Sequence, residues 1–103
     1  MTKKEFAEEY PIDFGNGVRG SWYSYKGTEH AGLIVAHLHS GGKLCAGAVG
    51  IKGRDFIGYD GNRPLWTLVS EDPLTLTPSI DNSQETGCNL HGFITNGVWI
   101  GPA

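Results

Sequence analysis

Four dipeptides that favour a left-handed backbone divide this chain into short segments. They are Asn16-Gly17, Gly41-Gly42, Asp60-Gly61 and Asn96-Gly97. Pairs of this kind occupy the central positions of two-residue β-hairpin loops, where most other residues would be strained. A chain interrupted so often has little room for long helices, so we expect short strands joined by tight turns.

The segments between these turns are rich in β-branched and aromatic residues and often alternate apolar with polar side chains, as strands do. We expect eight strands, over Val18–Tyr25, Ala31–His39, Leu44–Ile51, Phe56–Tyr59, Leu65–Val69, Leu74–Thr77, Asn89–Thr95 and Val98–Ile100. Residues 1–12 form an N-terminal arm in which residues 3–10 favour a short helix that Pro11 ends. The expected fold is mainly β, a small antiparallel sandwich or a partly open barrel.

Length and charge restrict the domain count and the partners. The chain has 103 residues without a repeat or a linker, so we expect a single domain over residues 1–103. A net charge of −3 and the lack of a basic cluster beyond Lys3-Lys4 argue against a nucleic-acid partner. No apolar run approaches the ~20 residues of a membrane span. The N-terminal residues also lack the apolar stretch of a signal peptide, so we expect a cytoplasmic protein without a membrane partner.

The chain contains two cysteines, Cys45 and Cys88. They are able to pair, but a reducing compartment favours two buried or half-buried thiols. We therefore expect thiols rather than a disulfide, in keeping with the cytoplasmic prediction.

The C-terminal third carries a serine and a histidine in a frame that suits nucleophilic catalysis. Ser79 follows Thr77-Pro78 at the end of a predicted strand, and His91 comes near the start of the next one, after a polar loop. Alternation sends the leucines and the isoleucine around Ser79 to the core and leaves Ser79 and His91 on the more polar faces of neighbouring strands. A serine in contact with a histidine is the minimum requirement for a Ser-His hydrolase.

The loop between them holds two candidates for an orienting acid. Asp81 or Glu85 would hold the imidazole of His91 as the third member of a triad, and backbone N–H groups near Ser79 would hold the oxyanion. The structural alternative makes Ser79 a turn residue bonded to local backbone and His91 an ordinary half-exposed side chain. The residues alone leave both interpretations open.

A second group of residues has the chemistry of metal ligands. His37 and His39 are two residues apart on a predicted strand, so their imidazoles face the same side, and Cys45 follows them. Cys88 and His91 offer two further ligands, and zinc is the metal that Cys and His bind tetrahedrally. The alternative zinc site therefore consists of His37, His39, Cys88 and His91. In the other interpretation the strand-end histidines face water and no cofactor is bound.

The region over residues 64–100 resembles the BubE-like family, which includes small phage proteins and proteins of bacterial ubiquitination-like operons. The resemblance is carried by Leu76-Thr77-Pro78-Ser79-Ile80, Cys88-x-x-His91-Gly92-Phe93-Ile94 and Asn96-Gly97, preceded by Trp66. It implies a serine peptidase, deubiquitinase-like, whose partner is a protein substrate conjugated to a bacterial ubiquitin-like protein. Carried over by position, Ser79 is the nucleophile and His91 the general base. Many members have paired cysteines in the N-terminal half that suggest a metal, where this chain has His37, His39 and Cys45.

Two other functions compete with hydrolysis. A non-catalytic phage or bacterial binding module would use Tyr23, Tyr25 and Tyr59, which we expect to be exposed. It predicts that Ser79→Ala leaves biological activity intact. A zinc-stabilised small β domain is the third interpretation, and it competes with the hydrolase because a metal-bound His91 is unable to act as a base.

Overall fold

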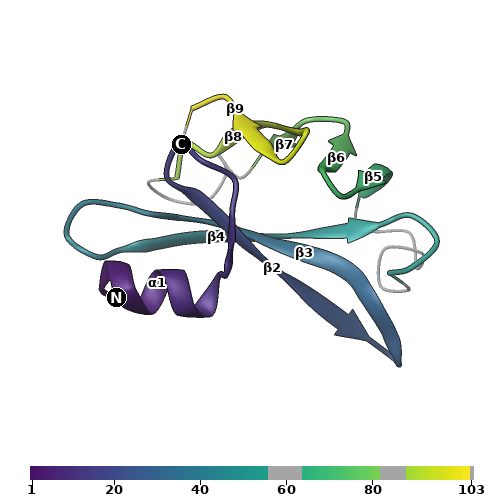
Figure 1. Cartoon of the computed structure of the whole chain (residues 1–103), viewed down its shortest axis with the longest axis horizontal. Coiled ribbons are helices and arrows are strands. Elements are labelled where there is room, and N and C mark those ends of the chain that lie inside the picture. The colour runs from purple at the N-terminus through teal and green to yellow at the C-terminus, as the bar shows by residue number, and fades with distance from the viewer. Residues whose placement is uncertain (56–63, 82–87, 103) are drawn as a thin grey trace.

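The computed structural model describes residues 1–55, 64–81 and 88–102. In these ranges the chain forms one helix and nine strands arranged in two sheets (Figure 1). The elements are α1 (Lys3–Glu9), β1 (Ile12–Asp13), β2 (Val18–Tyr25), β3 (Thr28–Leu38), β4 (Leu44–Ile51), β5 (Leu65–Glu71), β6 (Leu74–Thr77), β7 (Ile80–Asp81), β8 (His91–Thr95) and β9 (Val98–Ile100). The prediction of a mainly β fold with a short N-terminal helix is confirmed.

The predicted turns explain most of the strand ends. Asn16-Gly17, Gly41-Gly42 and Asn96-Gly97 all adopt positive φ, and β2, β4, β6 and β9 have the predicted bounds. One hairpin was not expected, because its turn is Lys26-Gly27 and lysine is not typical of a left-handed position. The predicted strand over Phe56–Tyr59 and its Asp60-Gly61 turn lie outside the described residues.

The strands form a six-stranded sheet in the order β1-β2-β3-β4-β5-β6 and a three-stranded sheet in the order β7-β8-β9. The prediction of an antiparallel fold is wrong for one pair. β4 and β5 run parallel, with Gly50 opposite Leu65 and Ile51 opposite Trp66. Parallel neighbours need a crossover of about a dozen residues, and residues 52–64 supply a connection of that length.

The main core fills the space between the two sheets. Leu33 and Val35 of β3 face it, and Ile94 and Trp99 of the small sheet close it together with Leu90, which directly precedes β8; all five are fully buried. The opposite face of β3 and β4 is covered by α1 (Figure 1). The large sheet therefore separates α1 from β7–β9, and β3 is buried on both faces.

A capping box starts α1. The Thr2 Oγ1 accepts the Glu5 N–H at 3.1 Å, and a Glu5 carboxylate oxygen accepts the Thr2 N–H at 3.0 Å. The bond from the Thr2 backbone lowers the pKa of Glu5 below its ordinary value. Phe6 and Tyr10 then pack against β3 and β4 as one aromatic pair. Among the described residues, no helix has the length and apolar character to span a membrane.

Candidate active site

Ser79 lies where the chain passes from one sheet to the other. β6 ends at Thr77, the Thr77–Pro78 peptide bond is cis, and β7 begins at Ile80. The indole Nε1 of Trp66 donates a hydrogen bond to the Ser79 carbonyl oxygen at 3.2 Å. The backbone of Ser79 is thereby tied to β5, which fixes its position between the two sheets.

His91 is the first residue of β8, next to β7. The register pairs Asp81 with His91 and Ile80 with Gly92. Ile80 and Gly92 are buried whereas Asp81 and His91 are exposed, so the latter two share the outer face of the small sheet. Cross-strand partners on one face have Cβ atoms about 4.5–5.5 Å apart, which brings the carboxylate within reach of the imidazole.

Alternation gives Ser79 the same face as Asp81. Continuing the register by one residue sets Ser79 opposite Phe93 and diagonal to His91. Diagonal neighbours lie about 7–8 Å apart at their Cα atoms and are still within reach of a long side chain such as histidine. His91 is exposed, as predicted, whereas Ser79 is half-buried and its assignment to this face stays a prediction. The other candidate acid, Glu85, lies outside the described residues.

The C-terminal turn holds the backbone of His91. The His91 N–H donates to the Pro102 carbonyl oxygen at 3.4 Å, and the Trp99 Nε1 donates to the Gly101 carbonyl oxygen at 3.1 Å. A Cβ on Gly92 would lie 2.2 Å from the Ile100 carbonyl oxygen. Only glycine permits this close approach of β8 to β9. The only sign of this requirement in the sequence is that a glycine directly follows the histidine.

Three apolar side chains continue the outer face beyond the polar residues. Phe93 is 47% exposed, Val98 46% and Ile100 54%. Phe93 and Ile100 are cross-strand partners, and Val98 lies two residues before Ile100 on the same face. We call these three residues the outer apolar strip. Sequence analysis missed the strip, although the alternation of Val98 and Ile100 about the buried Trp99 was a signal for it.

Cys45 and Cys88 form a disulfide, with their Cα atoms 5.9 Å apart. The prediction of two thiols is therefore wrong. It relied on a reducing compartment, whereas the fold brings β4 and the segment before β8 into the same core and buries both cysteines there. The disulfide also removes the cysteine argument for a cytoplasmic protein.

The predicted metal ligands are only partly brought together. His37 lies opposite Cys45 in the β3/β4 register, and its ring centroid is 4.8 Å from that of His39. Burial, and secondarily the neighbouring His39, lower the pKa of His37. His91 lies on the outer face, while Cys88 is buried in the core. No three His, Cys, Asp or Glu side chains of the described segments are grouped to hold a metal ion.

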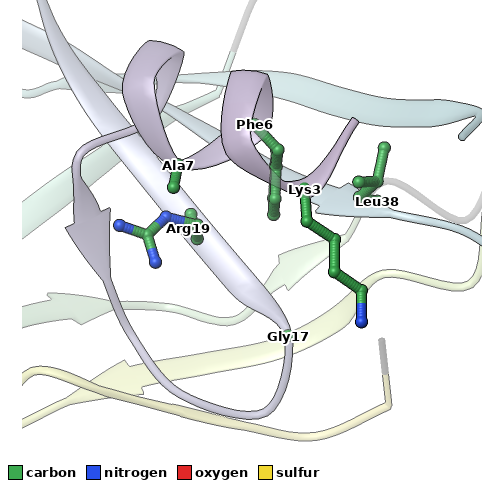
Figure 2. Close-up of a pocket in the computed structure, with 6 residues that line it drawn as sticks. All are labelled: Lys3, Phe6, Ala7, Gly17, Arg19 and Leu38. Atoms are coloured by element: carbon green, nitrogen blue, oxygen red, sulfur yellow. The ribbon is translucent and has the colours of Figure 1, made fainter. Parts of the chain in front are cut away.

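A cavity of about 260 Å³ lies between α1 and the first strands (Figure 2). Its lining residues are Lys3, Phe6, Ala7, Gly17, Arg19 and Leu38, none of them from the segment that carries Ser79 and His91. Arg19 is already bonded to the carbonyl oxygens of Tyr10 and Pro11 and to the carboxylate of Asp13. The cavity therefore belongs to the packing of α1 rather than to the candidate active site.

The tyrosines predicted to form a binding surface are less exposed than expected. Tyr23 is half-buried, and its hydroxyl donates a hydrogen bond to the buried carboxylate of Asp55. Tyr25 is half-buried beside Lys26, and Tyr59 lies outside the described residues. The feature that motivated a binding module is thus weaker in the structure than in the sequence.

Comparison with known families gives one match. A family described as "Bacterial ubiquitination-like system serine protease (BubE)" matches residues 19–100. The matched region contains β3–β9, β2 except its first residue, and all the candidate active-site residues. No curated protein and no solved structure matches the chain.

Proposed function

The chain belongs to the BubE family of bacterial ubiquitination-like system serine proteases, and from this membership we propose that it is a Ser-His hydrolase that cleaves proteins conjugated to a ubiquitin-like protein. The observation that carries the proposal is the β7/β8 register. It pairs Asp81 with His91 on the outer face, the face to which alternation also assigns Ser79.

In the proposed mechanism, Ser79 Oγ attacks the carbonyl carbon of the conjugate bond while His91 accepts the hydroxyl proton. The tetrahedral intermediate collapses to an acyl-enzyme as His91 returns that proton to the leaving amine. Water, deprotonated by His91, then hydrolyses the acyl-enzyme and restores Ser79. Asp81 orients the imidazole and stabilises its protonated form, and backbone N–H groups beside Ser79 hold the oxyanion.

The outer apolar strip suits a protein substrate. It lies on the outer face that Asp81 and His91 share, and Phe93 is two residues after His91 on β8. Apolar side chains of the bound polypeptide, near the bond to be cleaved, would cover part of this exposed surface. We propose that the strip contributes to binding of the substrate chain rather than to the chemical step.

A fluorophosphonate probe tests the proposed nucleophile, because it reacts with a serine only when a general base activates it. We expect the probe to label the wild type and mass spectrometry to locate the adduct on Ser79. Ser79→Ala and His91→Ala should abolish labelling, whereas Ser24→Ala, at an exposed serine of β2, should leave it unchanged.

Two results would contradict the proposal. One is a folded wild-type protein that is not labelled under conditions in which a known serine hydrolase is. The other is a Ser79→Ala variant that is labelled as fast as the wild type. A structure in which Ser79 Oγ and the His91 imidazole are more than ~7 Å apart would argue the same way, since proton transfer needs hydrogen-bond contact of about 3 Å.

A further inference from the structure

One tryptophan side chain contacts the backbone of the proposed nucleophile from the other sheet. The Trp66 Nε1 donates to the Ser79 carbonyl oxygen at 3.2 Å, although the two residues are 13 apart in sequence. Trp66 belongs to β5 of the large sheet, whereas Ser79 directly precedes β7 of the small sheet. This hydrogen bond therefore joins the two sheets at the residue on which the proposed chemistry depends.

The pairing of β5 with β6 explains why a side chain makes this bond. Thr67 is opposite Thr77, so continuing the register by one residue sets Trp66 opposite Pro78. Proline has no N–H and does not extend a ladder of backbone hydrogen bonds, and β6 ends just before it. The ladder thus stops before Ser79, and the Ser79 carbonyl bonds the indole N–H instead of a backbone N–H.

The peptide group between Ser79 and Ile80 lies between the two sheets. The His91 N–H donates to the Pro102 carbonyl oxygen, on the β9 side of β8. Alternate residues of a strand direct their N–H and C=O groups to opposite sides, so those of Gly92 face its register partner Ile80. The Ile80 N–H therefore faces β8, and in a planar trans peptide the Ser79 C=O points the opposite way, toward the indole.

The indole that donates this bond is itself held in place. The backbone of Trp66 is in register with Ile51 of β4, and its carbonyl oxygen accepts the Lys52 N–H at 2.9 Å. The side chain is half-buried and packs against the main core. A bond from a fixed donor restricts rotation of the peptide group after Ser79, and with it the direction of the Ser79 Cα–Cβ bond.

We propose that Trp66 is a positioning residue that keeps Ser79 Oγ within reach of His91 during hydrolysis. This role rests on the proposed function, because it requires Ser79 to be the nucleophile and assigns Trp66 no chemistry of its own. A reacting group displaced by about 1 Å reacts up to about 10²-fold more slowly. A single bond that holds the backbone of the nucleophile is therefore enough to affect the rate.

Trp66→Phe tests this role, since it removes the indole N–H and keeps an aromatic ring against the core. We expect the variant to react with a fluorophosphonate at Ser79 about ten- to a hundredfold more slowly than the wild type. The midpoint of the pH dependence of labelling should not move, because His91 still acts as the base. Urea denaturation identifies conditions in which each protein is fully folded, so that a loss of stability alone does not slow labelling.

Trp22→Phe is the matched control. Trp22 is also half-buried against the main core, but it lies on β2, with β3 and β4 between it and β5. Its indole stacks on the imidazole of His30, with the ring centroids 4.5 Å apart. This variant loses a similar part of its side chain and should be labelled at the wild-type rate.

The possible results distinguish the positioning role from the hydrolase itself. A wild type that is not labelled overturns both. A labelled wild type overturns the positioning role alone if Trp66→Phe reacts at the wild-type rate, or if both tryptophan variants are slowed equally. If Trp66→Phe does not fold, hydrogen exchange of the Trp66 indole in the wild type decides the question. Slow exchange supports the bond to Ser79, whereas exchange as fast as that of a solvent-exposed indole overturns the inference.

Discussion

At the scale of single residues, Asp81 decides whether the polar outer face is a triad or a Ser-His pair. It is the register partner of His91, and the other acidic candidate, Glu85, lies outside the described residues. An aspartate beside a catalytic imidazole holds the correct tautomer and stabilises the imidazolium that forms when the serine loses its proton. An asparagine of the same size retains the shape but loses the charge.

We therefore expect Asp81→Asn to slow the reaction of Ser79 with a fluorophosphonate by about 10²–10⁴-fold, the usual contribution of general-base catalysis. The measurement is the rate of adduct formation at a fixed probe concentration. Asp72→Asn, at an exposed acid in the turn between β5 and β6, is the matched control and should react at the wild-type rate. A wild-type rate in Asp81→Asn would assign the orienting role to another group.

A substitution at Gly92 tests how tightly the backbone next to His91 is packed against β9. Its Cβ-free backbone lies against the Ile100 carbonyl, so Gly92→Ala has to push β9 away from β8. Overpacking of this kind costs about 1–3 kcal/mol, and we expect a loss of that size in the free energy of unfolding measured by chemical denaturation. Asn89→Ala, at an exposed position of the same segment, should change it by less than about 0.5 kcal/mol. An equal effect of the two variants would contradict the steric argument.

At the scale of elements, the features that could be predicted from the sequence are those that depend on neighbouring residues in the chain. Left-handed turn residues marked the starts of β2, β4 and β9, and alternation predicted the exposed face of His91. β1 and β7 were missed because two residues are too few to show alternation. The Cys45–Cys88 disulfide and the β4/β5 parallel pair depend on contacts between distant segments, which no local pattern encodes.

We expect the outer apolar strip to affect binding of the substrate but not the rate of the chemical step. Phe93→Ser removes the central side chain of the outer apolar strip, which is already half exposed, so the fold should tolerate it. Covering about 40 Å² of this ring contributes about 1 kcal/mol, so we expect a roughly fivefold higher KM for a ubiquitin-like conjugate with kcat nearly unchanged. Labelling by the small fluorophosphonate should be unaffected.

Val69→Ser is the matched control for this experiment. Val69 is an apolar strand residue that is 62% exposed, but it lies on β5 in the other sheet. Its substitution should leave both KM and kcat at their wild-type values. A similar rise of KM in the two variants would mean that surface polarity in general, and not the strip, determines substrate binding.

Substitutions in the N-terminal capping box should show how much α1 contributes to the free energy of unfolding. Thr2→Ala removes the acceptor for the Glu5 N–H and should lower the free energy of unfolding by about 1 kcal/mol, while Thr2→Ser retains the bond and most of the stability. The contribution of the Glu5 carboxylate is present above its ordinary pKa of 4.5 and is lost as the pH falls through the lowered pKa of the folded protein. Urea denaturation of the three proteins at neutral and acidic pH checks both statements. Equal stability of Thr2→Ala and Thr2→Ser would show that α1 does not unfold together with the sheet.

At the scale of the whole molecule, the small sheet is attached to the large one at several points. The Trp99 N–H donates to the Phe14 carbonyl oxygen at 2.8 Å, and the Asn16 side chain donates to the Trp99 carbonyl oxygen at 2.7 Å. On the other side, the Gly97 N–H donates to the Leu74 carbonyl oxygen at 2.8 Å. These bonds hold the β8–β9 hairpin, while the disulfide fixes the chain three residues before His91.

The disulfide should therefore contribute a large part of the stability of the whole fold. It joins residues 43 apart in sequence, and closing a loop of that length in the unfolded chain corresponds to about 4 kcal/mol. We expect the reduced protein to lose about 2–4 kcal/mol in the free energy of unfolding measured with urea. Cys45→Ala/Cys88→Ala is the control: it should be about as unstable as the reduced protein and should not change when reductant is added. Equal stability of the oxidised and the reduced protein would show that hydrogen bonds and core packing alone hold the two sheets together.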